Sequence, residues 1–167
     1  HLLENRGLYQ QARQALQRAK KIARKYHRYY YLLFLLRKEA TYLFALDEKK
    51  MQENIERINQ ELKAINQTLS DENQLFEWYH QSIILIRGRS EAKETLDYLK
   101  KCIAPYPEHL ANREIASFYS TYLQESIRSS IAYHEGPAST YFQTSKELVQ
   151  IWRAHPHMIQ LEPHVYK

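Results

Sequence analysis

The stretch NRGLYQQARQALQRA, residues 5–19, decides the fold because it combines a helical apolar stripe with small residues at regular intervals. On a helical wheel of about 100° per residue, the apolar side chains from residue 8 to residue 26 fall within an arc of roughly 140°. They are Leu8, Tyr9, Ala12, Ala15, Leu16, Ala19, Ile22, Ala23 and Tyr26. Because alanines in such a stripe let another helix approach closely, the stretch predicts an amphipathic helix packed against a neighbouring helix.

The rest of the chain has the same preference for helix. No segment alternates polar and apolar residues with a period of two, and the first hundred residues contain no proline. We therefore predict an all-α fold with helices at approximately 8–27, 28–46, 48–69, 73–87, 90–103, 109–133 and 139–154. The sequence SDEN, residues 70–73, is expected to end the third helix, because Asp71 and Gln74 have the spacing of a capping box. Residues 155–164 are expected to form a connector.

The length of the chain predicts a single helical domain over residues 1–167. A chain of 167 residues suits one domain with a core of its own and is short for two. Helices joined by very short turns must lie antiparallel to their sequence neighbours, so the expected unit is a helical hairpin. Because the chain begins with His1 inside an expected helix end and stops just after a turn signal, we expect it to be a fragment of a longer protein.

The composition is that of a globular chain, with 44% apolar and 26% charged residues. Cys102 is the only cysteine, which excludes an intrachain disulfide framework and favours a reducing compartment. The longest apolar run, residues 29–36, is far shorter than a membrane span, and no signal-peptide pattern precedes it. We therefore expect a soluble, cytoplasmic protein that does not associate with membranes.

Five residues of the opening stretch resemble a known repeat. Gly7, Tyr9, Ala12, Leu16 and Ala19 are similar to the turn and second helix of a tetratricopeptide repeat (TPR), whose pattern is G-x-Y-x-x-A-x-x-x-[FY]-x-x-A. Leu16 occupies the aromatic place. In this family, the small residues allow close packing within a repeat and against the next one.

A weaker echo of the pattern follows 80 residues later. Ala92, Leu96 and Leu99 repeat the spacing of Ala12, Leu16 and Ala19, although Gly88 is displaced by one, Arg89 replaces the tyrosine and Leu99 replaces the second alanine. One further hairpin fits between the two at a period near 40 residues. The resemblance implies about three antiparallel hairpins stacked as a TPR-like right-handed solenoid. The alternative is an irregular α-helical bundle.

The TPR resemblance implies a non-catalytic scaffold whose first helices line a groove for a peptide or a partner helix. One subset of the family clamps a carboxylate pair with a lysine and an asparagine at the fifth and ninth places of a first helix. Those places hold Glu77 and Gln81 here, so that clamp is not expected. Arg37, Glu77 and Gln81 are the candidate groove residues, and the expected ligand is another protein or another segment of the parent chain.

The strongest electrostatic feature is a basic face opposite the apolar stripe of residues 8–28. Without its seven Lys or Arg residues, the chain would change from a net charge of +5 to −2. A solvated outer face is the simplest interpretation, and binding of an acidic protein or of nucleic acid, aided by the interleaved Tyr26, Tyr29, Tyr30 and Tyr31, is the alternative. The candidate residues are Arg13, Lys20, Lys21, Arg24, Lys25 and Arg28, with Arg18 beside them.

A narrow apolar seam follows between residues 47 and 69. Its members alternate in steps of four and three, as in a coiled coil about three heptads long. Packing against the preceding helix of the same chain is the simpler interpretation, and self-association is the alternative. The seam residues are Met51, Ile55, Ile58, Leu62 and Ile65.

No motif in the sequence indicates catalysis, a cofactor or a metal. A phosphate-cradling glycine loop, a G-x-S-x-G elbow and an HExxH motif are all missing. His155, His157 and His164 are close in sequence, but a proline separates the first two and only Glu162 joins them, so we do not predict a metal site. We predict that the chain is not an enzyme and carries no cofactor.

Overall fold

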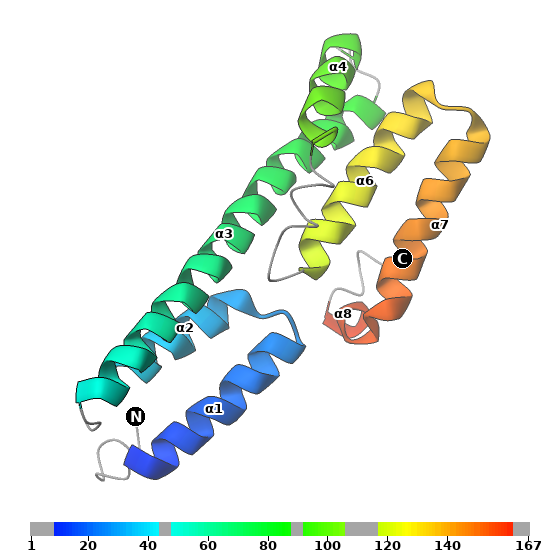
Figure 1. The fold of residues 1–167 in the computed structure, drawn as a ribbon. Coiled ribbons are helices and arrows are strands. Elements are labelled where there is room, and N and C mark those ends of the chain that lie inside the picture. The colour runs from blue at the N-terminus through cyan, green and yellow to red at the C-terminus, as the bar shows by residue number, and fades with distance from the viewer. Residues whose placement is uncertain (1–8, 44–47, 88–91, 106–116, 162–167) are drawn as a thin grey trace. The chain divides into compact units, whose positions relative to one another are not determined.

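The computed structural model describes residues 9–43, 48–87, 92–105 and 117–161 (Figure 1). These segments are helical with short turns and contain no strand, which confirms the all-α prediction for this part of the chain. The predicted helical residues 8, 44–46, 90–91 and 109–116 lie outside the described residues, as do Gly7, Gly88 and Arg89 of the TPR comparison. The helices are α1 Tyr9–Lys25, α2 Tyr29–Ala40, α3 Glu48–Ile86, α4 Ala92–Ile103, α6 Phe118–Glu135, α7 Ala138–Ala154 and α8 Pro156–Leu161.

The chain divides into two compact units, His1–Gln67 (unit 1) and Thr68–Lys167 (unit 2). Unit 1 contains α1, α2 and the first part of α3. Unit 2 contains the second part of α3 together with α4, α6, α7 and α8. The single domain expected over residues 1–167 stays a prediction.

α3 is one continuous helix from Glu48 to Ile86, so the predicted break at residues 70–73 is wrong. No glycine or proline lies within this helix, and polar residues alone do not oblige a helix to end. Glu72 is buried and accepts a hydrogen bond from the Ser117 hydroxyl, which belongs to the N-cap of α6. The Glu72 side chain therefore stabilises the contact between α3 and α6.

Backbone geometry explains where α1 ends. His27 has a φ of 52°, in the left-handed region, and follows the last turn of α1. The Arg28 N–H donates to the Ala23 carbonyl oxygen at 2.8 Å, and the His27 N–H donates to the Arg24 carbonyl oxygen at 3.1 Å. This pair of bonds is a Schellman motif, which turns the chain sharply into α2.

α2 and α8 also differ from the prediction. α2 ends at Ala40, earlier than the predicted residue 46, and the Thr41 hydroxyl donates to the Lys38 carbonyl oxygen at 2.8 Å beyond its last turn. The connector predicted at 155–164 is wrong for Pro156–Leu161, which form α8. A proline is tolerated at the first helical position, and Met158 gives this short helix a buried anchor.

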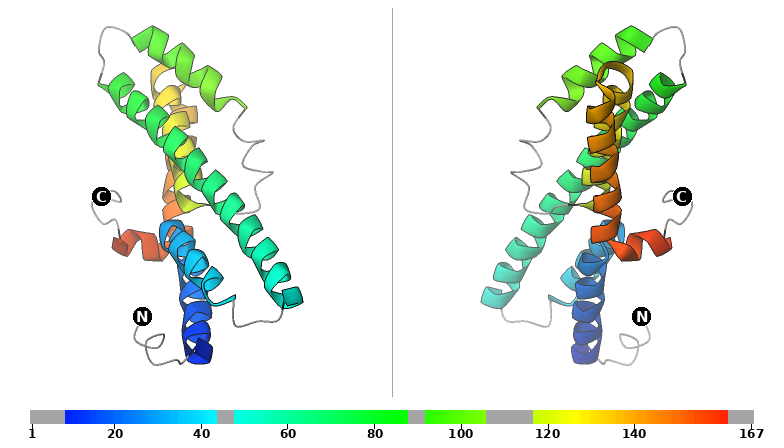
Figure 2. Two further views of the ribbon diagram at one scale, coloured as in Figure 1. Left: turned by 90° about the vertical axis from the view of Figure 1, so that its left-hand side faces the viewer. Right: turned by 90° about the vertical axis from the view of Figure 1, so that its right-hand side faces the viewer.

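The core of unit 1 is formed by buried residues of α1, of α2 and the turn after it, and of the first part of α3. The helices α1 and α2 pack as an antiparallel pair (Figure 2). Ala12 of the predicted stripe is buried, and Leu16 and Ala19 are half-buried. The remaining core is aliphatic and aromatic. It consists of Ala23, Tyr29, Leu32, Leu36, Tyr42, Leu43, Ile58 and Ile65.

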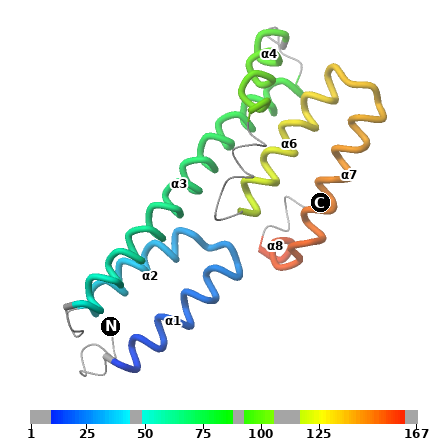
Figure 3. The backbone as a smooth tube through the Cα atoms, viewed as in Figure 1, coloured from blue at the N-terminus to red at the C-terminus, as the bar shows by residue number. Residues whose placement is uncertain are grey.

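Unit 2 is built on the α6–α7 hairpin, whose helices run side by side (Figure 3). One apolar cluster joins α3, α4 and α6 through Leu75, Trp78, Leu85, Leu96, Leu99, Ile103, Leu123 and Ile127. A second cluster joins α6, α7 and α8 through Phe118, Trp152 and Met158. α6 contributes to both clusters, so it is the helix that holds unit 2 together.

Candidate functional site

A groove between α3 and α4, within unit 2, is the strongest candidate for a binding site. It encloses about 600 Å³, a volume in the range of small-ligand sites. Two of the three predicted groove residues, Glu77 and Gln81, line it. The third, Arg37, does not line this groove and is exposed on α2 of unit 1. The described lining residues are Glu77, Trp78, His80, Gln81, Glu94, Thr95 and Tyr98.

Helical spacing aligns the groove side chains. Glu77 and Gln81 are four residues apart on α3, and Glu94 and Tyr98 are four residues apart on α4, so each pair lies on one helix face. Trp78 is 8% exposed and belongs to the apolar cluster of α3, α4 and α6. The groove therefore has a fixed aromatic residue beside a polar, solvent-exposed rim.

The charge of the groove is negative. Glu77 and Glu94 contribute carboxylates, and no lysine or arginine is among the described lining residues. A hydrogen bond and a charge interaction with Cys102 raise the pKa of the Tyr98 phenol, so Tyr98 is neutral at physiological pH. Unit 2 as a whole contains twelve Asp or Glu and ten Lys or Arg residues, whereas unit 1 contains seven and fourteen.

Sequence reasoning missed the α4 side of this groove. Glu94 and Tyr98 are four residues apart on the polar face of α4, a helix that the sequence predicted. Trp78 directly follows Glu77, a predicted groove residue. The sequence signal that could have found them is the succession of the predicted helices 73–87 and 90–103. If these two helices pack against each other, polar residues of both can line one groove.

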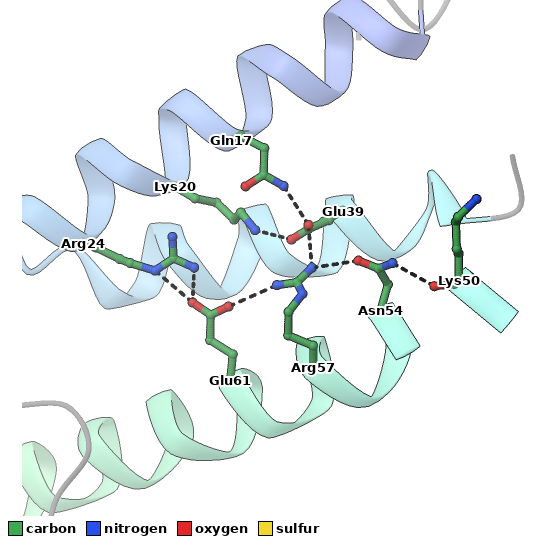
Figure 4. Close-up of polar contacts among 8 residues, drawn as sticks. All are labelled: Gln17, Lys20, Arg24, Glu39, Lys50, Asn54, Arg57 and Glu61. Carbon is green, nitrogen blue, oxygen red and sulfur yellow. Dashed lines mark hydrogen bonds and ion pairs between the residues drawn. The ribbon is translucent and has the colours of Figure 1, made fainter. Parts of the chain in front are cut away.

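The basic face of α1 differs from the predicted solvated face at Lys20, and Arg24 of the same face forms an ion pair within unit 1. The Lys20 side chain is 1% exposed and donates to the Glu39 carboxylate of α2. Arg24 donates through Nε to Glu61 of α3 at 2.9 Å and through a terminal guanidinium nitrogen to the same oxygen (Figure 4). Lys20 is therefore buried inside unit 1, whereas Arg24 stays exposed and forms a surface ion pair.

The buried arc of α1 is rotated relative to the arc that the wheel predicted. Ile22, at one edge of the predicted arc, is 58% exposed, whereas Lys20, just beyond the other edge, is buried. The difference is explained by Glu39 on α2, because its carboxylate accepts a hydrogen bond from the Lys20 ammonium between the two helices. Composition alone favours the most apolar arc, and a specific ion pair overrides it.

The rest of the basic face stays at the surface. Arg18, Lys21 and Lys25 are exposed, and Arg13 and Arg28 are half-buried. The Lys25 ammonium lies 5.4 Å from the ring centroid of Tyr26, within cation–π range. Three exposed cations thus persist as a candidate surface for an acidic ligand.

Glu39 is the hub of the polar network in unit 1 (Figure 4). It accepts hydrogen bonds from Gln17 Nε2 at 2.8 Å, from Lys20, and from Arg57 at 2.8 Å. Burial raises the pKa of this carboxyl, but the hydrogen bond and charge of Lys20 and the charge of Arg57 outweigh burial and hold the pKa below its ordinary value. Glu39 is therefore ionised, and its charge is met from α1 and α3.

Burial acts differently on Glu72. It raises the pKa of this carboxyl, and the hydrogen bond from Ser117 offsets only part of the effect. A raised pKa in the folded state means that this group favours folding at low pH and that its contribution is lost as the pH rises through that pKa. Glu72 is thus a structural residue of α3 that contacts the N-cap of α6, outside the groove.

The predicted seam on α3 is only partly accessible. Ile58 and Ile65 are buried, Met51 and Leu62 are half-buried, and Ile55 is exposed. Two of the five seam residues, Ile58 and Ile65, are thus already buried within the chain. Self-association through the seam stays a prediction that sedimentation tests directly.

The histidine-rich tail forms local contacts. The His155 ring nitrogen Nδ1 lies 3.0 Å from the Ile151 carbonyl oxygen, and the rings of His155 and His157 are 6.0 Å apart. His164 and Glu162 lie outside the described residues. Within the described segments, no group of three or more His, Cys, Asp or Glu side chains is arranged to hold a metal ion.

Comparison of the chain with protein-family models, with curated proteins and with solved structures finds no match. None of the helices in the described segments combines the length and apolar character needed to cross a membrane.

Proposed function

We propose that the chain is a non-catalytic, TPR-like helical scaffold that binds a segment of another protein in the groove between α3 and α4. One observation carries this proposal: the groove gathers Glu77 and Gln81 with aromatic residues from two helices. In the proposed arrangement, helical hairpins stack as a right-handed solenoid, although the continuous α3 removes the middle one of the three hairpins that the resemblance implied. Burial of Ala12, Leu96 and Leu99 supports the close packing that such a stack requires.

A site-specific crosslink tests the scaffold proposal. A photoreactive benzoylphenylalanine at Gln81, in the full chain, is expected to form a covalent adduct with a discrete polypeptide from an extract of the source organism. Excess unmodified chain is expected to abolish the adduct, because it competes for the same partner. The measurement is the mobility shift of the tagged chain on a denaturing gel.

Gln52 provides the matched control for this crosslink. It is also an exposed glutamine on α3, but it lies in unit 1, outside the groove. The same photoreactive residue at Gln52 is expected to give no adduct. No adduct from position 81, or equal adducts from both positions, rejects the groove as the binding site.

Nucleic-acid binding by unit 1 is the second candidate function. Tyr30 and Tyr31 of α2 are largely exposed, and they follow the basic α1 helix closely in sequence. Exposed aromatic rings beside cations suit the stacking and phosphate contacts of single-stranded nucleic acid. This candidate relies on Arg18, Lys21 and Lys25, because Lys20 and Arg24 are engaged by Glu39 and Glu61.

This second candidate predicts retention of a labelled 20-nucleotide single strand at about 50 mM salt, with affinity falling as salt rises. Reversing the charge of the three exposed residues is expected to weaken binding at least about tenfold, measured by fluorescence anisotropy. Reversal of Lys49, Lys50 and Lys63, three exposed lysines of α3, changes the net charge equally and serves as control. No binding at low salt, or equal losses in both triple variants, removes this function.

A further inference from the structure

We infer that the groove between α3 and α4 receives the cationic side chain of a partner protein, with arginine favoured over lysine. This inference rests on the proposed scaffold function and specifies the chemistry of its ligand. The occupant is an exposed, basic segment of another protein. The steps below follow from the charge, the ring chemistry and the size of the groove.

The charge of the groove selects a cation. Glu77 on α3 and Glu94 on α4 place one carboxylate on each helix, and no described lysine or arginine lines the groove to neutralise them. The two residues are exposed, so their carboxylates keep their hydration until a ligand arrives. A guanidinium between the two helices can pair with a carboxylate through two parallel hydrogen bonds, which an ammonium cannot do.

The rings of the groove favour the same ligand. Trp78 and Tyr98 line it together with the carboxylates, and Tyr98 is half-exposed. The face of an indole or phenol ring attracts a cation, and guanidinium also stacks on such a face. Gln81 and Thr95 supply neutral hydrogen-bonding groups for the flanking backbone of the partner.

The volume and surroundings of the groove suit a protein segment. About 600 Å³ accommodates one long side chain together with the backbone around it. Acidic residues outnumber basic ones in unit 2, so a basic partner is attracted to this unit, whereas the excess of basic residues in unit 1 repels it. Charge complementarity thus favours a basic segment over the acidic ligands that unit 1 attracts.

Tryptophan fluorescence provides the test. The chain has two tryptophans, and Trp152→Phe leaves Trp78 as the only reporter, located in the groove. Capped Gly-Ser nonapeptides with a single central Arg, Lys or citrulline are titrated at about 50 mM salt, where exposed charges are weakly screened. We expect a saturable change with the Arg peptide, a weaker one with the Lys peptide and none with the citrulline peptide.

Two sets of variants localise the binding. Glu77→Gln with Glu94→Gln is expected to weaken the Arg peptide at least about tenfold, because each substitution removes a charge-assisted contact. Glu53→Gln with Glu56→Gln alters exposed carboxylates of α3 in unit 1, changes the net charge equally and is expected to leave affinity unchanged. Circular dichroism confirms that each variant is folded.

A ring substitution separates cation–π contact from simple charge. Tyr98→Leu is expected to weaken the Arg peptide, and Tyr98→Phe is expected to restore it, because the phenyl face still attracts the cation. Equal affinity of the Leu and Phe variants shows that charge alone acts.

The outcomes distinguish this inference from the proposed function. Equal binding of the citrulline and arginine peptides, or equal losses of affinity in the two double Glu→Gln variants, rejects a cationic ligand. If the Gln81 crosslink still forms, the proposed scaffold function stands without it. A mass that rises with concentration in sedimentation, without peptide and dependent on Glu77 and Glu94, assigns the groove to a second copy of the chain and also overturns it. Failure of the Gln81 crosslink rejects the groove as the binding site of the proposed scaffold.

Discussion

Replacing Glu39 by alanine is expected to lower the free energy of unfolding of unit 1 by about 3–5 kcal/mol. The substitution leaves the Lys20 ammonium, only 1% exposed, without its counter-charge in the core. It also removes the acceptor used by Gln17 and Arg57. Urea unfolding followed by far-ultraviolet circular dichroism measures the loss, and amide hydrogen exchange of α1 and α2 assigns it to unit 1.

Two further variants define the cause of this loss. Lys20→Met combined with Glu39→Leu is expected to be within about 1 kcal/mol of the original chain or more stable, because packed apolar residues replace a buried ion pair without desolvation cost. Glu61→Ala, which removes a carboxylate paired with surface Arg24, is expected to cost at most about 1 kcal/mol. A single Glu39→Ala loss no larger than the Glu61→Ala loss contradicts the role of the buried pair.

The pH dependence of the same pair follows from the direction of the Glu39 shift. Its pKa in the folded state is below the ordinary value of 4.5, so the carboxylate stabilises the fold above about pH 4.5. That stability is lost as the pH falls through the lower, folded-state pKa. The stability difference between the original chain and the Lys20→Met, Glu39→Leu variant is therefore expected to shift in favour of the variant in acid.

Periodicity and sparse helix breakers were sufficient to predict the all-α fold class, but not the continuity of α3 or the short helix α8. They were insufficient for interactions that depend on a second helix. Lys20 lies outside the apolar arc of α1, and only its distant partner Glu39 makes its burial favourable. Glu39 was a usable signal, because it is the only acidic residue in the largely apolar segment 29–40. A carboxylate on a buried helix needs a cation as its partner.

The candidate site was half predictable for a similar reason. Glu77 and Gln81 were predicted from their places in the TPR pattern. Glu94 and Tyr98 could not be predicted in this way, because their place in the groove depends on which face α4 turns toward α3. The predicted break at residues 70–73 was wrong because capping residues allow a helix to end but do not force it to. The Glu72 side chain accepts a hydrogen bond from Ser117, the N-cap of α6, and α3 continues beyond it.

Replacing Phe118 by alanine is expected to lower the free energy of unfolding of unit 2 by about 3–5 kcal/mol. Phe118 is 1% exposed, its ring centroid lies 4.9 Å from that of Trp152 on α7, and it stacks on Tyr122 at 5.9 Å. The cavity left behind deprives α7 and α8 of their contact with the start of α6. Urea unfolding followed by tryptophan fluorescence reports directly on this unit, because both tryptophans belong to it.

Phe142 on α7 is the matched control for Phe118, because the same atoms are removed from a ring that is 70% exposed. Phe142→Ala is expected to change stability by at most about 0.5 kcal/mol, as surface substitutions do. The apolar cluster behind the groove includes Leu123 and Ile127 of α6, so losing the anchor of α6 at Phe118 is also expected to weaken binding at the groove. Equal effects of Phe118→Ala and Phe142→Ala on the free energy of unfolding would contradict this role, because they would show that the Phe118 cluster does not hold α6 in place. The position of α6 behind the groove would then depend on other contacts.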